Sequence, residues 1–199
     1  MNSNGKTPYQ LNTAKLSEII QPLPQPKYTC DLMMITARSQ LINMAGEDDS
    51  LLVLNPDFQR GHVWTLKQQQ FFIECMLRNS LPLACYQLTF NMPFFASTEE
   101  EKINLRYPGL VCIDGLQRFT AIEDFVTGKF RVFNNQIAFE DTLRSAFSLK
   151  NKSFKLNVFE NNDPDEIIKL YLSLNTAGTA HSEDEIKRVE KLLHCKNNA

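Results

Sequence analysis

The 199-residue sequence lacks several features that mark common functional classes. It has only three histidines, and its five cysteines include no Cys-X-X-Cys pair, so we expect neither a zinc site nor a disulfide framework. No apolar run has the length of a signal peptide or a membrane span, which predicts a cytoplasmic protein without a membrane partner. Basic and acidic side chains number 21 and 23, and the resulting net charge of -2 argues against a surface that binds nucleic acid by charge alone.

The sequence does contain enough apolar side chains for one substantial core. At 43% apolar, a chain of this length buries roughly 70% of the surface that its unfolded state exposes. Four of the nine prolines fall within residues 1–28, where "QPLPQPKY" is typical of an extended connector. We therefore expect residues 1–28 to form a partly disordered arm and residues 29–199 to form one domain.

Short-range patterns predict a mixture of helices and strands. Apolar spacing, capping pairs such as Thr65 with Gln68, and the Asp163-Pro164 start set the expected bounds. The predicted helices cover about 31–46, 65–79, 116–127, 163–173 and 182–193, and the predicted strands cover 51–54, 83–90, 109–113, 130–133 and 153–160. Because these elements follow no regular β-α-β order, we predict an α+β domain with a small mixed sheet flanked by helices.

The segment "LVCIDGLQRFTAI", residues 110–122, has the clearest chemical signal. A buried strand ends at Asp114-Gly115 and opens directly into a helix, whose first N–H groups and dipole favour an anion. Gly115 allows a tight turn, Arg118 in the first turn can hold two phosphate oxygens, and Asp114 can cap the helix or hold a metal. The alternative is an ordinary helix cap with Arg118 paired to a nearby carboxylate.

Two other loops carry residues of the same kind. Gln59 and Arg60 follow the first buried strand, and Arg60 would add a second guanidinium if the two loops converge. Asn175, Thr176 and Gly178 lie between two predicted helices and could bind a phosphate or a ribose, although a helix-to-helix loop needs such residues in any case.

The order of these segments resembles a known family. "LNPDFQRGHVW", "IDGLQRFTAIEDFVTG" and "LYLSLNTAGTAHSEDEI" are similar to the "PxxQRxxVW", "DGQQRLT" and "FxRxNTGG" motifs of the N-terminal domain of GmrSD-type modification-dependent restriction enzymes. The resemblance runs from about Leu32 to Leu193. That domain looks like the ParB and sulfiredoxin fold, whose members hold nucleoside triphosphates with an arginine motif. The resemblance thus implies a ParB/sulfiredoxin-like fold and a role in restriction or phage defence in a bacterial or phage-infected cell.

The same resemblance implies a set of site residues. The implied catalytic residues are Asp114, Gln117 and Arg118. The implied nucleotide-binding residues are Gln59, Arg60, Gly115, Arg118, Thr120, Asn175, Thr176 and Gly178. Asp114 is also the implied ligand for Mg²⁺, which would accompany the nucleoside triphosphate.

Three positions depart from the family motifs. Leu116 stands where the family has the first glutamine of "DGQQR", Ser173 replaces the arginine of the late motif, and Ala177 replaces its first glycine. These changes weaken the case for turnover more than the case for binding, because one charge-assisted contact to an anion contributes about 1.5–3 kcal/mol. In the family an HNH-type nuclease domain follows this domain, and the sequence holds no such signature, so we expect a partner to supply a nuclease or another effector.

The sequence leaves three functions open. The first is a nucleoside-triphosphate-binding domain, with Mg²⁺-dependent hydrolysis as its possible activity. The second is a non-catalytic protein of the same fold that binds or inhibits a defence or DNA-processing partner. The third, DNA binding or nicking, ranks last because the net charge is negative and the segment "KRVEK" interleaves its charges.

Overall fold

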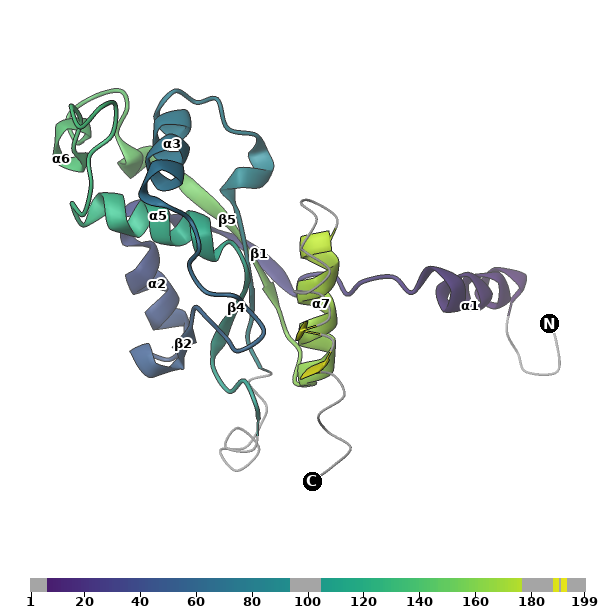
Figure 1. Cartoon of the computed structure of the whole chain (residues 1–199). Helices are drawn as coiled ribbons and strands as arrows, with labels where there is room; N and C mark the ends of the chain where they lie inside the picture. The colour runs from purple at the N-terminus through teal and green to yellow at the C-terminus, as the bar shows by residue number, and fades with distance from the viewer. Residues whose placement is uncertain (1–6, 94–104, 177–187, 190, 193–199) are drawn as a thin grey trace.

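The computed structural model describes residues 7–93, 105–176, 188–189 and 191–192, and within them the chain forms a mixed sheet with helices on both faces (Figure 1). The strands are β1 (Tyr28–Met33), β2 (Leu52–Val53), β3 (Gln87–Asn91), β4 (Leu110–Asp114) and β5 (Ser153–Phe159). The helices are α1 (Pro8–Ile20), α2 (Ala37–Met44), α3 (Leu66–Leu77), α5 (Leu116–Val126), α6 (Phe139–Thr142) and α7 (Pro164–Thr176). Short 3-10 helices are η1 (Met34–Thr36), η2 (Asp49–Leu51), η3 (Leu83–Tyr86) and η4 (Leu149–Asn151). The predicted α+β class with a mixed sheet is confirmed.

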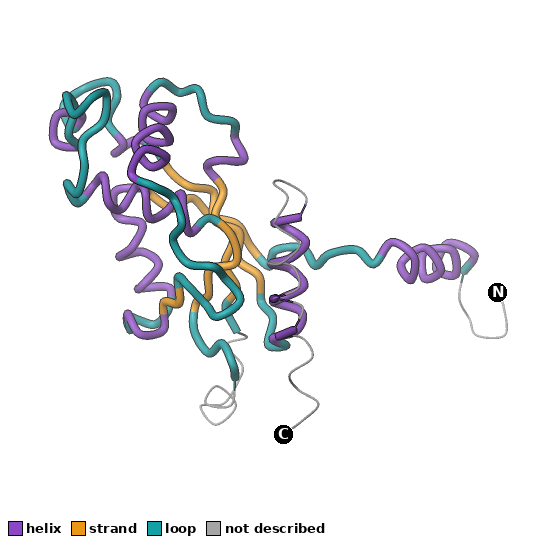
Figure 2. The backbone as a smooth tube through the Cα atoms, viewed as in Figure 1, coloured by secondary structure: helices purple, strands orange, loops and turns teal. Residues whose placement is uncertain are grey.

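The five strands lie in the order β1-β5-β3-β4-β2, and Figure 2 shows them at the centre of the domain. β1 with β5 and β3 with β4 are antiparallel pairs, whereas β5 with β3 and β4 with β2 are parallel pairs. β4 is buried on both faces: Leu110 and Cys112 belong to one apolar cluster, and Val111 and Ile113 belong to the other. An uninterrupted apolar run is what a strand covered on both faces needs.

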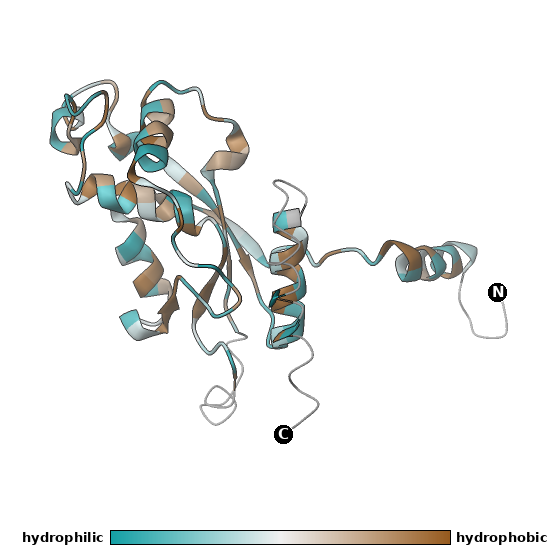
Figure 3. Cartoon of the chain, viewed as in Figure 1, coloured by the Kyte–Doolittle hydropathy of each residue, from teal (hydrophilic) through white to brown (hydrophobic). Residues whose placement is uncertain are grey.

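Two apolar clusters hold the helices to the sheet. The larger cluster packs α2, α3 and α5 against one face, and the smaller one packs α7 and Phe58 against the other. Figure 3 shows hydrophobic colouring along the central strands, while the helices mix hydrophobic and hydrophilic positions as amphipathic helices do. β4 and the start of α5 therefore lie between the two clusters, where packing on both sides fixes the backbone.

Several local predictions are confirmed by the structure. Thr65 and Gln68 form the capping box of α3, and the amide of Asp165 donates to the Asp163 side chain at the start of α7. α5 spans nearly the predicted residues, and Gly128, with a φ of +76°, follows its last turn.

Some local predictions were wrong. Residues 83–86, predicted as the first half of a strand, form η3, and β3 begins only at Gln87. The helix predicted over 182–193 lies largely outside the described residues.

Residues 31–33 are not helical but complete β1, where Leu32 pairs with Phe154 of β5 and both side chains are buried. The pairing with a distant strand outweighs the helical spacing of the local apolar residues. Residues 130–133 form no strand, since Val132 makes only an isolated bridge with Ile137.

The N-terminal arm contains a helix that the sequence patterns did not predict. α1 begins with a capping box between Thr7 and Gln10, and none of its residues is buried. Figure 1 shows α1 away from the body of the domain, and residues 21–27 connect it to β1. No helix of the described part of the chain is long and apolar enough to cross a membrane.

Candidate functional site

One pocket of about 120 Å³ is lined by both Gln-Arg pairs. The first pair lies in the loop after β2, and the second lies in the first turn of α5. The loop after β2, the β4–α5 turn and α7 all contribute to its wall. We call it the motif pocket, and its lining residues are Gln59, Arg60, Gly61, Trp64, Ile113, Asp114, Gly115, Leu116, Gln117, Arg118, Tyr171 and Asn175. Three segments that are far apart in the sequence thus come together at the start of α5.

The β4–α5 turn requires a glycine at position 115. Gly115 has a φ of +108°, and a Cβ atom there would lie 2.4 Å from Leu88 Cδ2 and 3.3 Å from Arg118 Nη2. Within the described residues no side chain caps α5, so Asp114 does not have the capping role considered above. The uncapped helix start adds a partial positive charge at this edge of the pocket.

Asp114 pairs with Arg118 instead. Arg118 Nη2 donates to Asp114 Oδ2 at 2.5 Å, and both side chains are at least partly shielded from solvent. Arg118 Nε is buried and has no hydrogen-bond partner within the described part of the chain. A buried donor without a protein partner beside a pocket is suited to bind a polar ligand or a water.

Arg60 gives the motif pocket its excess of positive charge. Its side chain is exposed and lines the pocket, and no described carboxylate forms an ion pair with it. Among the described residues that line the pocket, the charged ones are Arg60, Arg118 and Asp114, two positive charges and one negative. A concave surface with unbalanced positive charge and a helix start favours an anion.

The two glutamines of the site bond to the backbone of the opposite segment. Gln59 Nε2 donates to the Cys112 carbonyl of β4 at 2.6 Å. Gln117 Oε1 accepts from the amides of Val63 and Trp64 at 3.0 and 3.1 Å. Gln117 Nε2 donates to the Gly61 carbonyl at 2.7 Å.

The late segment is only partly within the described residues. Asn175 lines the motif pocket, and its Nδ2 donates to the Tyr171 carbonyl at 2.8 Å. Thr176 is the last residue of α7 rather than part of a loop, and Gly178 lies outside the described residues. Thr120 is half-buried on α5 and is not one of the described residues that line the pocket.

The sequence patterns did not identify Asp57, whose side chain holds the loop just before Gln59. Asp57 accepts hydrogen bonds from Tyr107 Oη and Arg106 Nη2, both at 2.6 Å. Burial acts to raise the pKa of Asp57, but these hydrogen bonds and the Arg106 charge hold it below its usual value. Burial and the Asp57 carboxylate raise the pKa of Tyr107.

A late arginine holds the same loop from the other side. Arg188 donates to the carbonyls of Asp57 and Phe58 at 3.1 and 2.7 Å. No local motif marks Arg188 or Asp57, since their partners lie far away in the sequence. These contacts anchor the loop before Gln59, and the bonds of Gln117 to residues 61–64 anchor it after Arg60.

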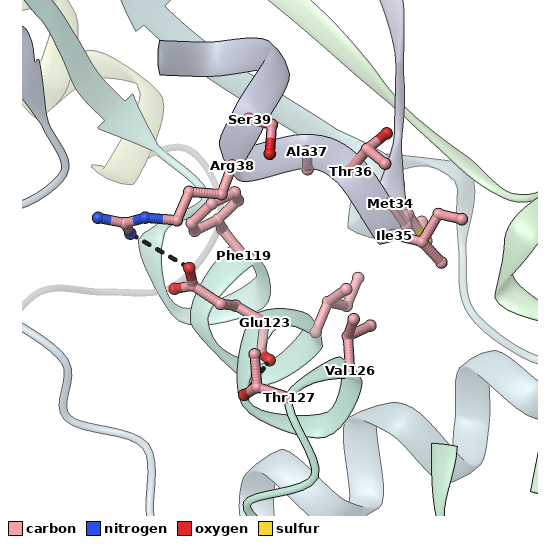
Figure 4. A pocket seen from close by; sticks show the side chains of 11 residues that line it. Met34, Ile35, Thr36, Ala37, Arg38, Ser39, Phe119, Glu123, Val126 and Thr127 are labelled. Atoms are coloured by element: carbon pink, nitrogen blue, oxygen red, sulfur yellow. Dashed lines mark hydrogen bonds and ion pairs between the residues drawn. The ribbon is translucent and has the colours of Figure 1, made fainter. Parts of the chain in front are cut away.

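A second pocket of about 140 Å³ lies between η1, the start of α2 and the later turns of α5 (Figure 4). We call it the α2–α5 pocket. Figure 4 shows the ion pair between Arg38 and Glu123, 3.1 Å long, and Arg38 also pairs with Asp49 at 3.1 Å. With its arginine shared between two carboxylates, this pocket is a poorer anion site than the motif pocket.

A third hollow of about 270 Å³ is larger but mostly apolar. It lies near the end of α3 and α6, with Phe133 and Phe147 in its wall, and contains no residue that the sequence motifs mark. This hollow therefore has the larger volume. The motif pocket has the charged and polar groups, and the binding of a phosphate depends on such groups.

The described residues contain no group of three or more His, Cys, Asp or Glu side chains that could hold a metal ion by themselves. Asp114 is the one acidic side chain among the described residues that line the motif pocket. Any metal there would need further oxygen ligands from a bound molecule or water.

Comparison with known proteins identifies the family. The family model described as the GmrSD restriction endonuclease N-terminal domain matches residues 39–192, most of the chain. No curated protein and no solved structure gives a significant match. The matched span includes every described residue that lines the motif pocket. The chain therefore belongs to the GmrSD restriction endonuclease N-terminal domain family, which links it to DNA restriction.

Proposed function

We propose that the motif pocket binds the phosphates of a nucleoside triphosphate, and that this binding serves a restriction or defence system. The observation that carries the proposal is that Arg60 and Arg118, 58 positions apart in the sequence, line one pocket at the uncapped start of α5. Membership in a family of restriction-endonuclease domains supports the biological setting.

Each part of the pocket has a role in this proposal. Arg118 presents its fork of donors, including the buried Nε, to phosphate oxygens, while Arg60 approaches from the opposite loop. The backbone at Gly115 leaves room for close approach, and the start of α5 adds its partial charge. Asn175 closes the α7 side.

The residues fit Mg²⁺ only as part of a complex with phosphate. Mg²⁺ is commonly bound through one or two carboxylates together with substrate phosphates and waters, and Asp114 can supply one carboxylate. When bound, Mg²⁺ would neutralise charge on the phosphates and orient them. We extend the proposal to slow hydrolysis, in which Asp114 would position the attacking water.

The size of the pocket favours phosphate recognition over recognition of a base. Its volume of about 120 Å³ is well below the roughly 300 Å³ at which pockets for drug-sized ligands begin. The pocket therefore accommodates the phosphates, and the nucleoside would extend over the rim. This geometry supports a site that selects for phosphate number more than for the base.

A second candidate is a binding or interaction protein without turnover. Leu116, where the family has a glutamine, is buried in the larger apolar cluster and offers no polar group. Ser173, where the family has an arginine, donates to the Lys169 carbonyl at 2.8 Å and is not among the described residues that line the pocket. These two positions favour binding over catalysis and leave room for a partner that supplies the effector.

The finer assignments from the sequence belong to the same proposal. We propose that residues 29–199 form one ParB/sulfiredoxin-like domain with residues 1–28 as its arm, and that it works in the cytoplasm with a nuclease or effector partner. The mixed sheet with helices on both faces and the strand–glycine–helix turn support this fold assignment.

Calorimetric titration of the full chain with ATP, GTP, CTP and UTP, each with Mg²⁺, tests the proposal. At about 0.1 mM protein we expect measurable heat for at least one nucleotide, and Arg118→Ala should weaken binding by about tenfold or more. Arg38→Ala is the matched control, because Arg38 also lies against α5 but in the α2–α5 pocket. No heat with any nucleotide, or equal affinity for the wild type and Arg118→Ala, would overturn the proposal. Release of inorganic phosphate in the same samples measures hydrolysis.

A further inference from the structure

In each Gln-Arg pair, the glutamine side chain forms hydrogen bonds with the backbone of the segment that carries the other pair. Gln59 precedes Arg60 and bonds to the Cys112 carbonyl, two residues before Asp114. Gln117 precedes Arg118 and bonds to the segment 61–64, immediately after Arg60. The two glutamines therefore join the two arginine-bearing segments crosswise.

The carboxamide of Gln117 is almost fully used by these contacts. A glutamine side chain has one oxygen with two lone pairs and two N–H donors. The oxygen accepts from both Val63 and Trp64, and one N–H donates to the Gly61 carbonyl. Its oxygen has no remaining capacity to accept from a ligand, and its contacts are with protein backbone.

The segment that Gln117 holds has little regular structure of its own. Residues 54–65 form no helix or strand, and Gly61 has a φ of +75°. A loop of this kind gains its fixed shape from side chains of the surrounding elements. Since Arg60 is exposed and without a described carboxylate partner, the position of its guanidinium depends on the position of this loop.

We infer that Gln59 and Gln117 are positioning residues that hold Arg60 beside Arg118, so that both guanidinium groups reach the same phosphate. They act on the anion through Arg60 and do not touch it. Fixing the loop before binding removes the ordering cost that a free loop would add to each binding event. The inference depends on the proposed function for its ligand, but the crosswise contacts can be measured without any ligand.

A double-mutant cycle with inorganic tripolyphosphate as the probe tests the inference. Affinity is measured for the full-length wild type, Gln117→Ala, Arg60→Ala and the double variant. We expect Gln117→Ala to weaken binding about tenfold in the wild type and by less than about twofold when Arg60 is already alanine. Gln70→Ala is the matched control, because Gln70 also donates to a loop carbonyl, that of Arg131 at 2.7 Å, away from the motif pocket.

Three measurements distinguish a failure of the positioning role from a failure of the proposed function. Amide hydrogen exchange at Val63 and Trp64 should speed up in Gln117→Ala without any ligand, and unchanged exchange would overturn the crosswise contacts themselves. Gln117→Glu keeps the acceptor for the amides of Val63 and Trp64, so their exchange should stay close to that of the wild type, while its negative charge weakens tripolyphosphate binding. Effects of Gln117→Ala and Arg60→Ala that simply multiply, or an equal loss in Gln70→Ala, would overturn the positioning role. A wild type that binds no tripolyphosphate but shows the exchange effect would contradict the proposed function alone.

Discussion

The two pockets along α5 contain the same kinds of side chain, but their charges balance in opposite ways. The described charged side chains of the motif pocket are two arginines and one carboxylate, Asp114, which pairs with Arg118 alone. In the α2–α5 pocket one arginine, Arg38, is shared by Glu123 and Asp49. The motif pocket also lies at the helix start, where the dipole is positive, and the α2–α5 pocket lies along the later turns. An arginine that pairs with a carboxylate therefore indicates an anion site only where the pocket keeps a net positive charge and lies at the N-terminus of a helix.

The two pockets also differ in how their walls are held. The loop of the motif pocket is fixed by side chains from other elements, including Gln117 of α5 and Arg188 near the end of the chain. The wall of the α2–α5 pocket is formed by residues of η1, α2 and α5, which have regular structure of their own. We therefore expect the motif pocket to respond more strongly to single substitutions at its turn and loop.

The largest effect is expected at the turn of the motif pocket. Gly115→Ala should destabilise the fold by about 2–4 kcal/mol, because a Cβ would meet Leu88 and the φ of +108° disfavours a side chain. Gly46→Ala is the matched control: Gly46 also has a positive φ, +93°, but a Cβ there would meet nothing within 4 Å. It should cost only about 1 kcal/mol. Urea unfolding of both variants measures the difference, and equal losses would contradict a steric requirement at the turn.

An intermediate effect is expected from the counter-ion of Arg118. In Mg²⁺-free buffer, Asp114→Asn should tighten tripolyphosphate binding about fivefold, since it removes the one negative charge among the described side chains that line the motif pocket. Glu123→Gln makes the same kind of change in the α2–α5 pocket and should leave this affinity unchanged. Fluorescence or calorimetric titration of the two variants compares them. Equal tightening in both would mean that only the overall charge matters.

The smallest effect is expected from the anchor of the Arg60 loop. Because the folded-state pKa of Asp57 lies below its unfolded value of about 3.9, its stabilising contribution is present above that value. The contribution is lost as the pH falls through the lowered pKa. The difference in unfolding free energy between the wild type and Asp57→Asn should therefore shrink when urea unfolding is moved from pH 7 to about pH 3. A difference independent of pH would contradict the ionised anchor.

The parts of the fold that local patterns determine were predictable. The apolar run of β4, the glycine turn and the capping box at Thr65 act over a few residues, and the sequence indicates each of them directly. The end of β1 was not predictable in this way, because residues 31–33 are paired with β5, which is far away in the sequence. Helical spacing and strand pairing competed there, and the pairing dominated.

The same distinction between local patterns and long-range contacts applies to the candidate site. Arg60 and Arg118 could be marked from their motifs, and the structure brings them to one pocket. The bond from Gln59 to Cys112 spans 53 residues and the bond from Tyr107 to Asp57 spans 50, and no spacing in the sequence encodes such partners. The sequence could therefore name the charged groups but not the side chains that hold them in place.

Mapping the anion by NMR tests the central claim most directly. Backbone ¹H–¹⁵N spectra of the full chain are recorded during titration with inorganic tripolyphosphate. Our account predicts saturable shifts of the amides of Gly61 and Gly115, with much smaller shifts at Arg38 and Ser39 in the α2–α5 pocket. Shifts centred on Arg38 and Ser39, or no saturable shift at Gly61 and Gly115, would contradict the claim that the motif pocket is the phosphate site.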